Sequence, residues 1–192
     1  AEEHFFTIKK KLKEKKIVVK SLGFSNLQKT DDDSIVFPIS NNKIIKFYNK
    51  IIFNPYMYSK IKKEIDLFKP DIINLFNANN YTKTLFSTLK GYKIVQTILD
   101  YRLICPVFSC DKNDRLNICE GIECTNKYLI KNYFKRFLTF YHYKQLKKTT
   151  SNSVDAFICP SPHLKKCLDR NSFKPVKQIP LLSSKLVKKY NN

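Results

Sequence analysis

The sequence is poor in several residue types that mark particular classes of protein. It has three glycines and no tryptophan in 192 residues, which excludes collagen-like and glycine-rich repeats. No apolar run approaches the roughly 18 residues of a membrane-spanning helix, and no basic segment precedes an apolar one at the N-terminus. We therefore expect a chain that neither spans a membrane nor is secreted. We expect it in the cytoplasm, with peripheral binding to a membrane as an option.

Acidic residues are also few, since 36 Lys and Arg stand against 16 Asp and Glu and give a formal net charge of +20. Such a charge is typical of proteins that bind nucleic acids or anionic membranes. Only four of these basic residues are arginines, and arginine is the residue that recognises bases and phosphates through paired hydrogen bonds. The composition argues against sequence-specific nucleic-acid binding and leaves an anionic membrane surface open as a partner.

The sequence contains an alternation of helix-like and strand-like segments. Apolar spacing and capping residues predict helices at residues 2–16, 54–68, 81–90, 127–148 and 161–170. Short apolar or β-branched runs predict strands at residues 17–19, 43–48, 71–76, 93–99, 155–158 and 176–179. Strands joined through helices of this length pair in parallel. The sequence therefore predicts one α/β domain over residues 1–184, a Rossmann-like parallel sheet with helices on both faces, followed by a linker or tail at 185–192.

Several segments, in this order, resemble the N-terminal domain of family-four glycosyltransferases of GT-B fold. The segment 95–106 is the most specific, because it ends in Asp100-Tyr101-Arg102-Leu103-Ile104-Cys105-Pro106 and is followed by Cys119 and Cys124. The segments 69–77, 155–161 and 176–180 are similar to other strands of that family. The resemblance covers nearly the whole chain and implies one half of a GT-B fold, with its first strand expected before Ala1.

The resemblance implies an enzyme that transfers a sugar from a nucleotide-sugar donor to a glycan or lipid-linked acceptor. The N-terminal domain of such enzymes mainly binds the acceptor, and the C-terminal domain binds the sugar nucleotide. That donor domain is expected after about Ser184, so the 192 residues are expected to be an incomplete glycosyltransferase that is inactive alone. The alternative is a non-catalytic remnant of the same fold that keeps a glycan- or membrane-binding surface.

The candidate acceptor-binding residues lie at the ends of predicted strands, where parallel sheets bind ligands. They are Asn77, Asp100, Tyr101, Arg102 and Ser161. Asp100 is also the candidate catalytic residue, because a carboxylate there can hold acceptor hydroxyls; capping of its loop is the alternative. Compared with the family, histidines are replaced by Asn74, Phe76 and Leu99, which weakens the prediction of an active enzyme.

Four cysteines follow the fourth strand-like segment with four, eight and four residues between them: Cys105, Cys110, Cys119 and Cys124. Four thiolates are a ligand set for tetrahedral zinc, although the spacing is wider than in common zinc ribbons, and separate reduced thiols are the alternative. Cys159 and Cys167 fall in a strand and a helix, where we expect small buried hydrophobes. Zinc and the nucleotide sugar of a full-length enzyme are the cofactors considered.

Two further features have both a structural and a functional interpretation. His4, His142 and His163 are far apart in sequence, and we expect each to pack at or below the surface without a catalytic partner. The predicted helix at 127–148 interleaves aromatic residues with basic ones such as Lys131, Lys135 and Arg136. That pattern is typical either of a helix at a membrane interface or of a helix with one face on the sheet and lysines in water.

Overall fold

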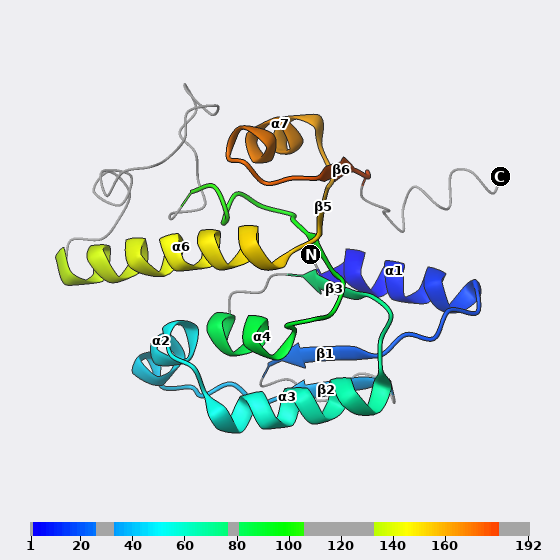
Figure 1. The fold of residues 1–192 in the computed structure, drawn as a ribbon, viewed down its shortest axis with the longest axis horizontal. Coiled ribbons are helices and arrows are strands. Elements are labelled where there is room, and N and C mark those ends of the chain that lie inside the picture. The colour runs from blue at the N-terminus through cyan, green and yellow to red at the C-terminus, as the bar shows by residue number, and fades with distance from the viewer. Residues whose placement is uncertain (1, 26–32, 77–80, 106–132, 181–192) are drawn as a thin grey trace. The chain divides into compact units, whose positions relative to one another are not determined.

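The computed structural model describes residues 2–25, 33–76, 81–105 and 133–180. Its chain divides into two compact units, residues 1–48 with 180–192 and residues 49–179, and each is described by itself. Helices and parallel strands make up both units, so the prediction of an α/β protein is confirmed (Figure 1). No helix among the described residues is long and apolar enough to cross a membrane.

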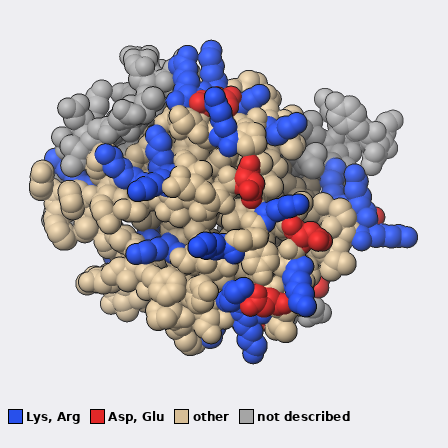
Figure 2. Space-filling model, viewed as in Figure 1, with Lys and Arg blue, Asp and Glu red and all other residues tan. Residues whose placement is uncertain are grey.

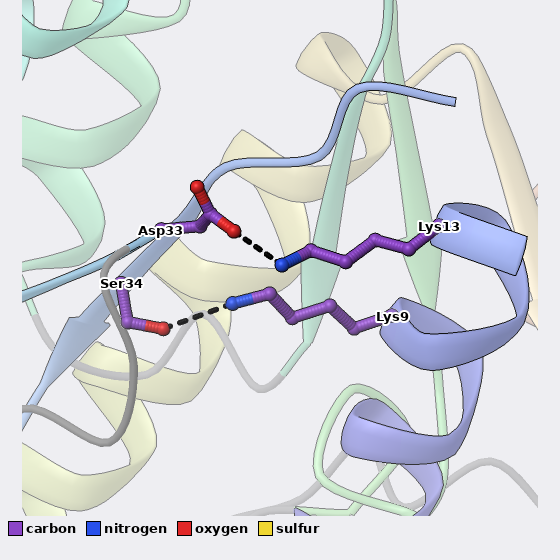
Figure 3. A network of polar contacts seen from close by, with 4 residues as sticks. All are labelled: Lys9, Lys13, Asp33 and Ser34. Atoms are coloured by element: carbon purple, nitrogen blue, oxygen red, sulfur yellow. Dashed lines mark hydrogen bonds and ion pairs between the residues drawn. The ribbon is translucent and has the colours of Figure 1, made fainter. Parts of the chain in front are cut away.

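The first unit begins with helix α1 (Glu2–Glu14), which agrees with the predicted helix. Strands β1 (Ser21–Phe24) and β2 (Ser34–Phe37) pair in parallel. Lysines of α1 hold the start of β2, as Figure 3 shows: Lys13 pairs with Asp33, and the Nζ of the buried Lys9 donates to Ser34 Oγ over 3.1 Å. The aliphatic stem of Lys9 can be buried because its ammonium reaches this hydroxyl.

The strand predicted at residues 17–19 is wrong. Ile17 and Val18 are 49% and 80% exposed, and the backbone of Ile17 takes part in the turn that ends α1. Lys16 takes a left-handed conformation with φ of 60°, while its N–H bonds the Lys13 carbonyl and the Ile17 N–H bonds the Leu12 carbonyl. This is the Schellman pattern that closes helices, and it delays the strand to Ser21.

The strand predicted at residues 43–48 is also wrong, because these residues form helix α2 (Lys43–Ile51). Asn42 precedes the helix, and its Oδ1 accepts from the backbone N–H groups of Ile44 and Ile45 at 2.8 and 3.4 Å. An asparagine in this position satisfies amides that a helix start otherwise leaves without partners. The cap therefore outweighs the strand preference of the isoleucines.

The second unit contains a four-stranded parallel sheet in the order β3-β4-β5-β6. Its strands are β3 (Ile73–Phe76), β4 (Ile94–Thr97), β5 (Ala156–Cys159) and β6 (Val176–Gln178). Three of them lie within predicted segments, and β5 extends one residue past its predicted end at Ile158. At the amino ends of β4 and β5, the Ile94 N–H donates to Asp155 Oδ2 over 2.7 Å, and the Asp155 N–H donates to the Ile94 carbonyl over 2.9 Å. These reciprocal bonds fix the register of the two central strands.

Among the described residues, four helices lie entirely in the same unit as this sheet: α3 (Pro55–Phe68), α4 (Thr82–Thr88), α6 (Tyr133–Ser153) and α7 (Pro162–Arg170). The predicted start and end of α3 are confirmed, because Asn54 Oδ1 accepts from the Met57 N–H over 3.0 Å and Lys69 takes the left-handed cap conformation. The predicted helix at 127–148 extends to Ser153, while its residues 127–132 lie outside the described part. The sheet and helices enclose a core with Ile61, Leu89, Phe157 and Phe173 at 1% exposure or less.

Candidate functional site

The loop after β4 contains an ion pair between the carboxylate of Asp100 and the guanidinium of Arg102. Asp100 Oδ1 accepts from the backbone N–H of Arg102 over 3.0 Å, and Arg102 Nε lies 2.9 Å from Asp100 Oδ2. The first contact is an Asx turn, which is the capping role considered for Asp100. The two side chains keep 45% and 35% of their surface exposed, so both groups remain accessible from solvent.

Tyr101, which lies between these two residues, connects the loop to helix α7. Its hydroxyl lies 3.0 Å from Nδ1 of His163, the second residue of α7, and the two rings meet edge-on with centroids 6.0 Å apart. This contact was not predicted, because the sequence led us to expect only packing at or below the surface for His163. A separation of 62 residues hid this contact from inspection of the sequence. The parallel register, which pairs Thr97 with Ile158, brings both segments to one edge of the sheet.

Ser161 performs a structural task with its side chain. It is the N-cap of α7, and its Oγ accepts from the Leu164 N–H over 3.2 Å. The hydroxyl retains its own hydrogen as a donor, so capping does not remove Ser161 from the set of candidate ligand contacts. Asp100, Tyr101, Arg102 and Ser161 thus all lie in segments that follow the carboxyl ends of β4 and β5.

One predicted site residue, Asn77, follows the neighbouring strand β3. Asn77 lies outside the described residues, so its role stays a prediction. Asn74 is within β3, and its Oδ1 accepts from Thr97 Oγ1 of β4 over 3.0 Å. The side-chain amide of Asn74 therefore joins two strands of the sheet.

Three of the cysteines are described, and all are buried and outside any disulfide bond: Cys105, Cys159 and Cys167. Burial raises the pKa of the Cys159 and Cys167 thiols, which keeps them protonated and poorly nucleophilic. The prediction that these two act as small buried hydrophobes is confirmed, with exposures of 1% and 3%. Cys167 Sγ also lies 3.8 Å from Nδ1 of His163, the same nitrogen that Tyr101 contacts.

The zinc hypothesis rests on residues that are mostly outside the described part of the chain. Cys110, Cys119 and Cys124 fall there, and Cys105 is the last described residue before them, with no exposed surface. Within the described ranges, no group of three or more His, Cys, Asp or Glu side chains is arranged to hold a metal ion. The four-cysteine site stays a prediction.

A cavity of about 730 Å³ lies at the opposite edge of the sheet, near the amino ends of β4 and β5. Its lining includes Lys83, Lys90, Lys93, Thr149, Asn152 and Asp155. None of the residues that the sequence nominated for ligand binding lines it. We place the candidate site at the carboxyl edge, because parallel sheets bind their ligands there and because Tyr101 and His163 meet there with Asp100 and Arg102 beside them.

Basic side chains are scattered over the face of the molecule drawn in Figure 2, with acidic ones among them. Nucleic-acid grooves usually gather their lysines and arginines in one stripe or patch. The distribution on this face has no such concentration. The low expectation for nucleic-acid binding stays a prediction.

Comparison of the chain with protein-family models, with curated proteins and with solved structures finds no significant match. The resemblance to glycosyltransferases therefore rests on the sequence motifs alone. What the fold establishes is an α/β class with parallel strands, consistent with a Rossmann-like arrangement.

Proposed function

We propose that the chain is the acceptor-side domain of a glycosyltransferase of GT-B fold, which binds a glycan or lipid-linked acceptor for transfer of a sugar from a nucleotide-sugar donor. The proposal includes a cytoplasmic location. It assigns the sugar nucleotide to a separate domain, because the carboxylates that bind the donor in that family have no counterpart in these 192 residues.

The observation that supports this function best is the contact between Tyr101 and His163. It brings the most family-specific segment of the sequence, residues 95–106, against the first turn of α7. Arg102 lies beside it, with its guanidinium oriented by Asp100. A guanidinium, a phenol and an imidazole at the carboxyl edge of a parallel sheet form a suitable set of donors for the hydroxyls and phosphates of an acceptor.

In this proposal Asp100 is a positioning residue. Its carboxylate is already engaged by the Arg102 backbone and guanidinium, which leaves it a poor general base. The same ion pair, together with Leu99, Asn74 and Phe76 in place of histidines, favours the second candidate function. That candidate is a binding domain that has lost its chemistry and retains a glycan surface.

The test is acceptor binding by the purified 192-residue chain, measured by saturation-transfer NMR with a panel of glycans and polyprenyl-phosphate sugars. We expect one acceptor class to bind and no sugar to be transferred from any nucleotide-sugar donor. Arg102→Gln should weaken that binding about tenfold or more, because a charge-assisted hydrogen bond contributes roughly 1.5–3 kcal/mol.

Lys83→Gln is the matched control, since it removes one positive charge from the opposite edge of the sheet. The control should bind the acceptor as the unmodified chain does. Sugar transfer by the isolated chain would show that the donor site has been assigned wrongly. Equal binding by the Arg102 and Lys83 variants, or no binding to any acceptor, would remove the support for an acceptor site.

A further inference from the structure

Helix α6, the long yellow helix of Figure 1, has one face that packs in the core. Tyr143, Leu146 and Thr150 are exposed by 5%, 4% and 0%, at spacings of three and four residues. The Tyr143 hydroxyl donates to the Ile104 carbonyl over 2.9 Å and fixes the helix against the end of the β4 loop. Because this face is anchored inside the second unit, the opposite face has a defined orientation.

The opposite face is aromatic over its first two turns. Tyr133, Phe134, Phe137 and Tyr141 are exposed by 75%, 66%, 51% and 42%. At 100° per residue these four positions fall in one stripe, centred about half a turn from the packed face. Single exposed aromatics are ordinary, but a contiguous stripe of four is typical of a surface that meets another phase or partner.

Lysines continue the same stripe toward the C-terminal end of the helix. Lys144 and Lys148 are exposed and share its angular range, and Lys144 Nζ lies 4.9 Å from the centroid of the Phe140 ring. The whole of α6 contains no aspartate or glutamate. From Tyr133 to Lys148 the stripe runs about 22 Å, aromatic in one half and basic in the other.

We propose that this stripe, Tyr133, Phe134, Phe137, Tyr141, Lys144 and Lys148, binds the surface of an anionic lipid bilayer. Rings at headgroup depth combined with lysines facing anionic headgroups are the two attractions that hold an interfacial helix. Charge complementarity selects this occupant, because the helix has no acidic residue and the chain carries a net charge of +20. The inference goes beyond sugar transfer and does not depend on it.

The structure also changes which basic residues of α6 we expect to contribute to membrane binding. The sequence singled out Lys131, Lys135 and Arg136 near the start of the helix. Lys131 and the side chain of Lys135 lie outside what the structure describes, and Arg136 is only half-exposed and lies outside the stripe. The lysines that share the stripe with the exposed rings are Lys144 and Lys148.

The test is co-sedimentation of the 192-residue chain with vesicles of phosphatidylcholine alone or of equal parts phosphatidylcholine and phosphatidylserine. We expect binding to the anionic vesicles, weak binding to the neutral ones, and loss of most binding at high salt. The double variant Lys144→Gln with Lys148→Gln should bind anionic vesicles roughly ten- to thirtyfold more weakly. Tyr133→Ser with Phe137→Ser should also weaken binding about tenfold or more, since the rings provide the apolar contact.

The matched control is Lys63→Gln with Lys83→Gln, which removes the same charge from exposed positions on α3 and α4. Its vesicle binding should fall less than about threefold, because the general attraction of a basic chain is spread over many residues. All substituted residues are exposed, so circular dichroism should give one melting temperature for the set. Equal losses in the Lys144/Lys148 variant and the control would overturn the proposal. So would equal binding to both vesicle types, or self-association through the stripe without vesicle binding.

Discussion

Replacing Phe157 with alanine should lower the free energy of unfolding by about 3–5 kcal/mol. Phe157 lies in β5 at the centre of the four-stranded sheet and is 1% exposed. Its ring meets that of the fully buried Phe173 edge-on, with centroids 5.3 Å apart. Alanine leaves a cavity on the face of the sheet beside Phe173, and the hydrogen-bonded strands are too rigid for neighbouring side chains to close it fully. Urea denaturation of the two proteins measures the difference.

Phe137→Ala provides the control for this measurement, because Phe137 is 51% exposed on α6. Surface substitutions of this kind usually change stability by less than about 0.5 kcal/mol. A loss below about 1 kcal/mol for Phe157→Ala would contradict the position of its ring in the core. A domain of this size is stable by roughly 5–15 kcal/mol, so the expected loss is a large fraction of the total.

The stability of the protein should fall as the pH is lowered from 6.5 towards 4, because of His142. Burial, helped by the positive charge of Lys50, lowers the pKa of this histidine from 6.5 to about 4. Its Nε2 is buried without a hydrogen-bond partner, which also suits a neutral ring. The unfolded chain takes up a proton near pH 6.5, whereas the folded chain takes it up only near pH 4.

The contribution of neutral His142 is therefore fully present above pH 6.5 and is lost between that value and about 4. The loss reaches roughly 3 kcal/mol at the acid end, at 1.36 kcal/mol per unit of pKa difference. Urea denaturation at several pH values measures it. Carboxylates titrate in the lower part of this range, so His142→Leu is the comparison that isolates the histidine. A stability profile equally steep in the variant would contradict the assignment.

Helices that begin with a recognisable capping residue were predictable from the sequence. The pair Asn54-Pro55 indicates the start of α3, and the pair Ser161-Pro162 indicates the start of α7. In both helices the side chain of the cap residue accepts a hydrogen bond from a backbone N–H of the first turn, as expected. The information lies within four residues and needs no tertiary contact. The strands of the main sheet were also recognisable, because each of these short apolar runs follows a predicted helix, as in a parallel crossover.

The two wrong strand predictions fall on short apolar runs that could form either a strand or part of a helix or its closing turn. Residues 17–19 have a strand-like composition, but the backbone of Ile17 is needed for the turn that closes the preceding helix. Residues 43–48 look similar, but Asn42 starts a helix there. In both segments a backbone hydrogen-bonding requirement outweighed the preference of β-branched side chains.

The candidate site was predictable only as separate residues. Sequence reasoning nominated Asp100, Tyr101, Arg102 and Ser161 from their places after strands, and the structure describes all four there. It missed His163, because the spacing between His163 and Tyr101 carries no motif. The signal that points to the contact is the parallel pairing of β4 with β5, which places the ends of both strands at one edge.

That same pairing sets the order in which the sheet can assemble. Ile73 precedes its partner Ile94 by 21 residues, and Phe157 precedes Val176 by 19, whereas Val95 precedes Ala156 by 61. Closing the longer loop costs roughly 1 kcal/mol more in chain entropy, so the β4–β5 seam should join two preformed strand pairs. Pulse-labelled hydrogen exchange during refolding would detect protection of Ile73 before that of Asp155, and simultaneous protection would contradict this order. Because Tyr101 meets His163 across the seam, the candidate site becomes complete only at the end of folding.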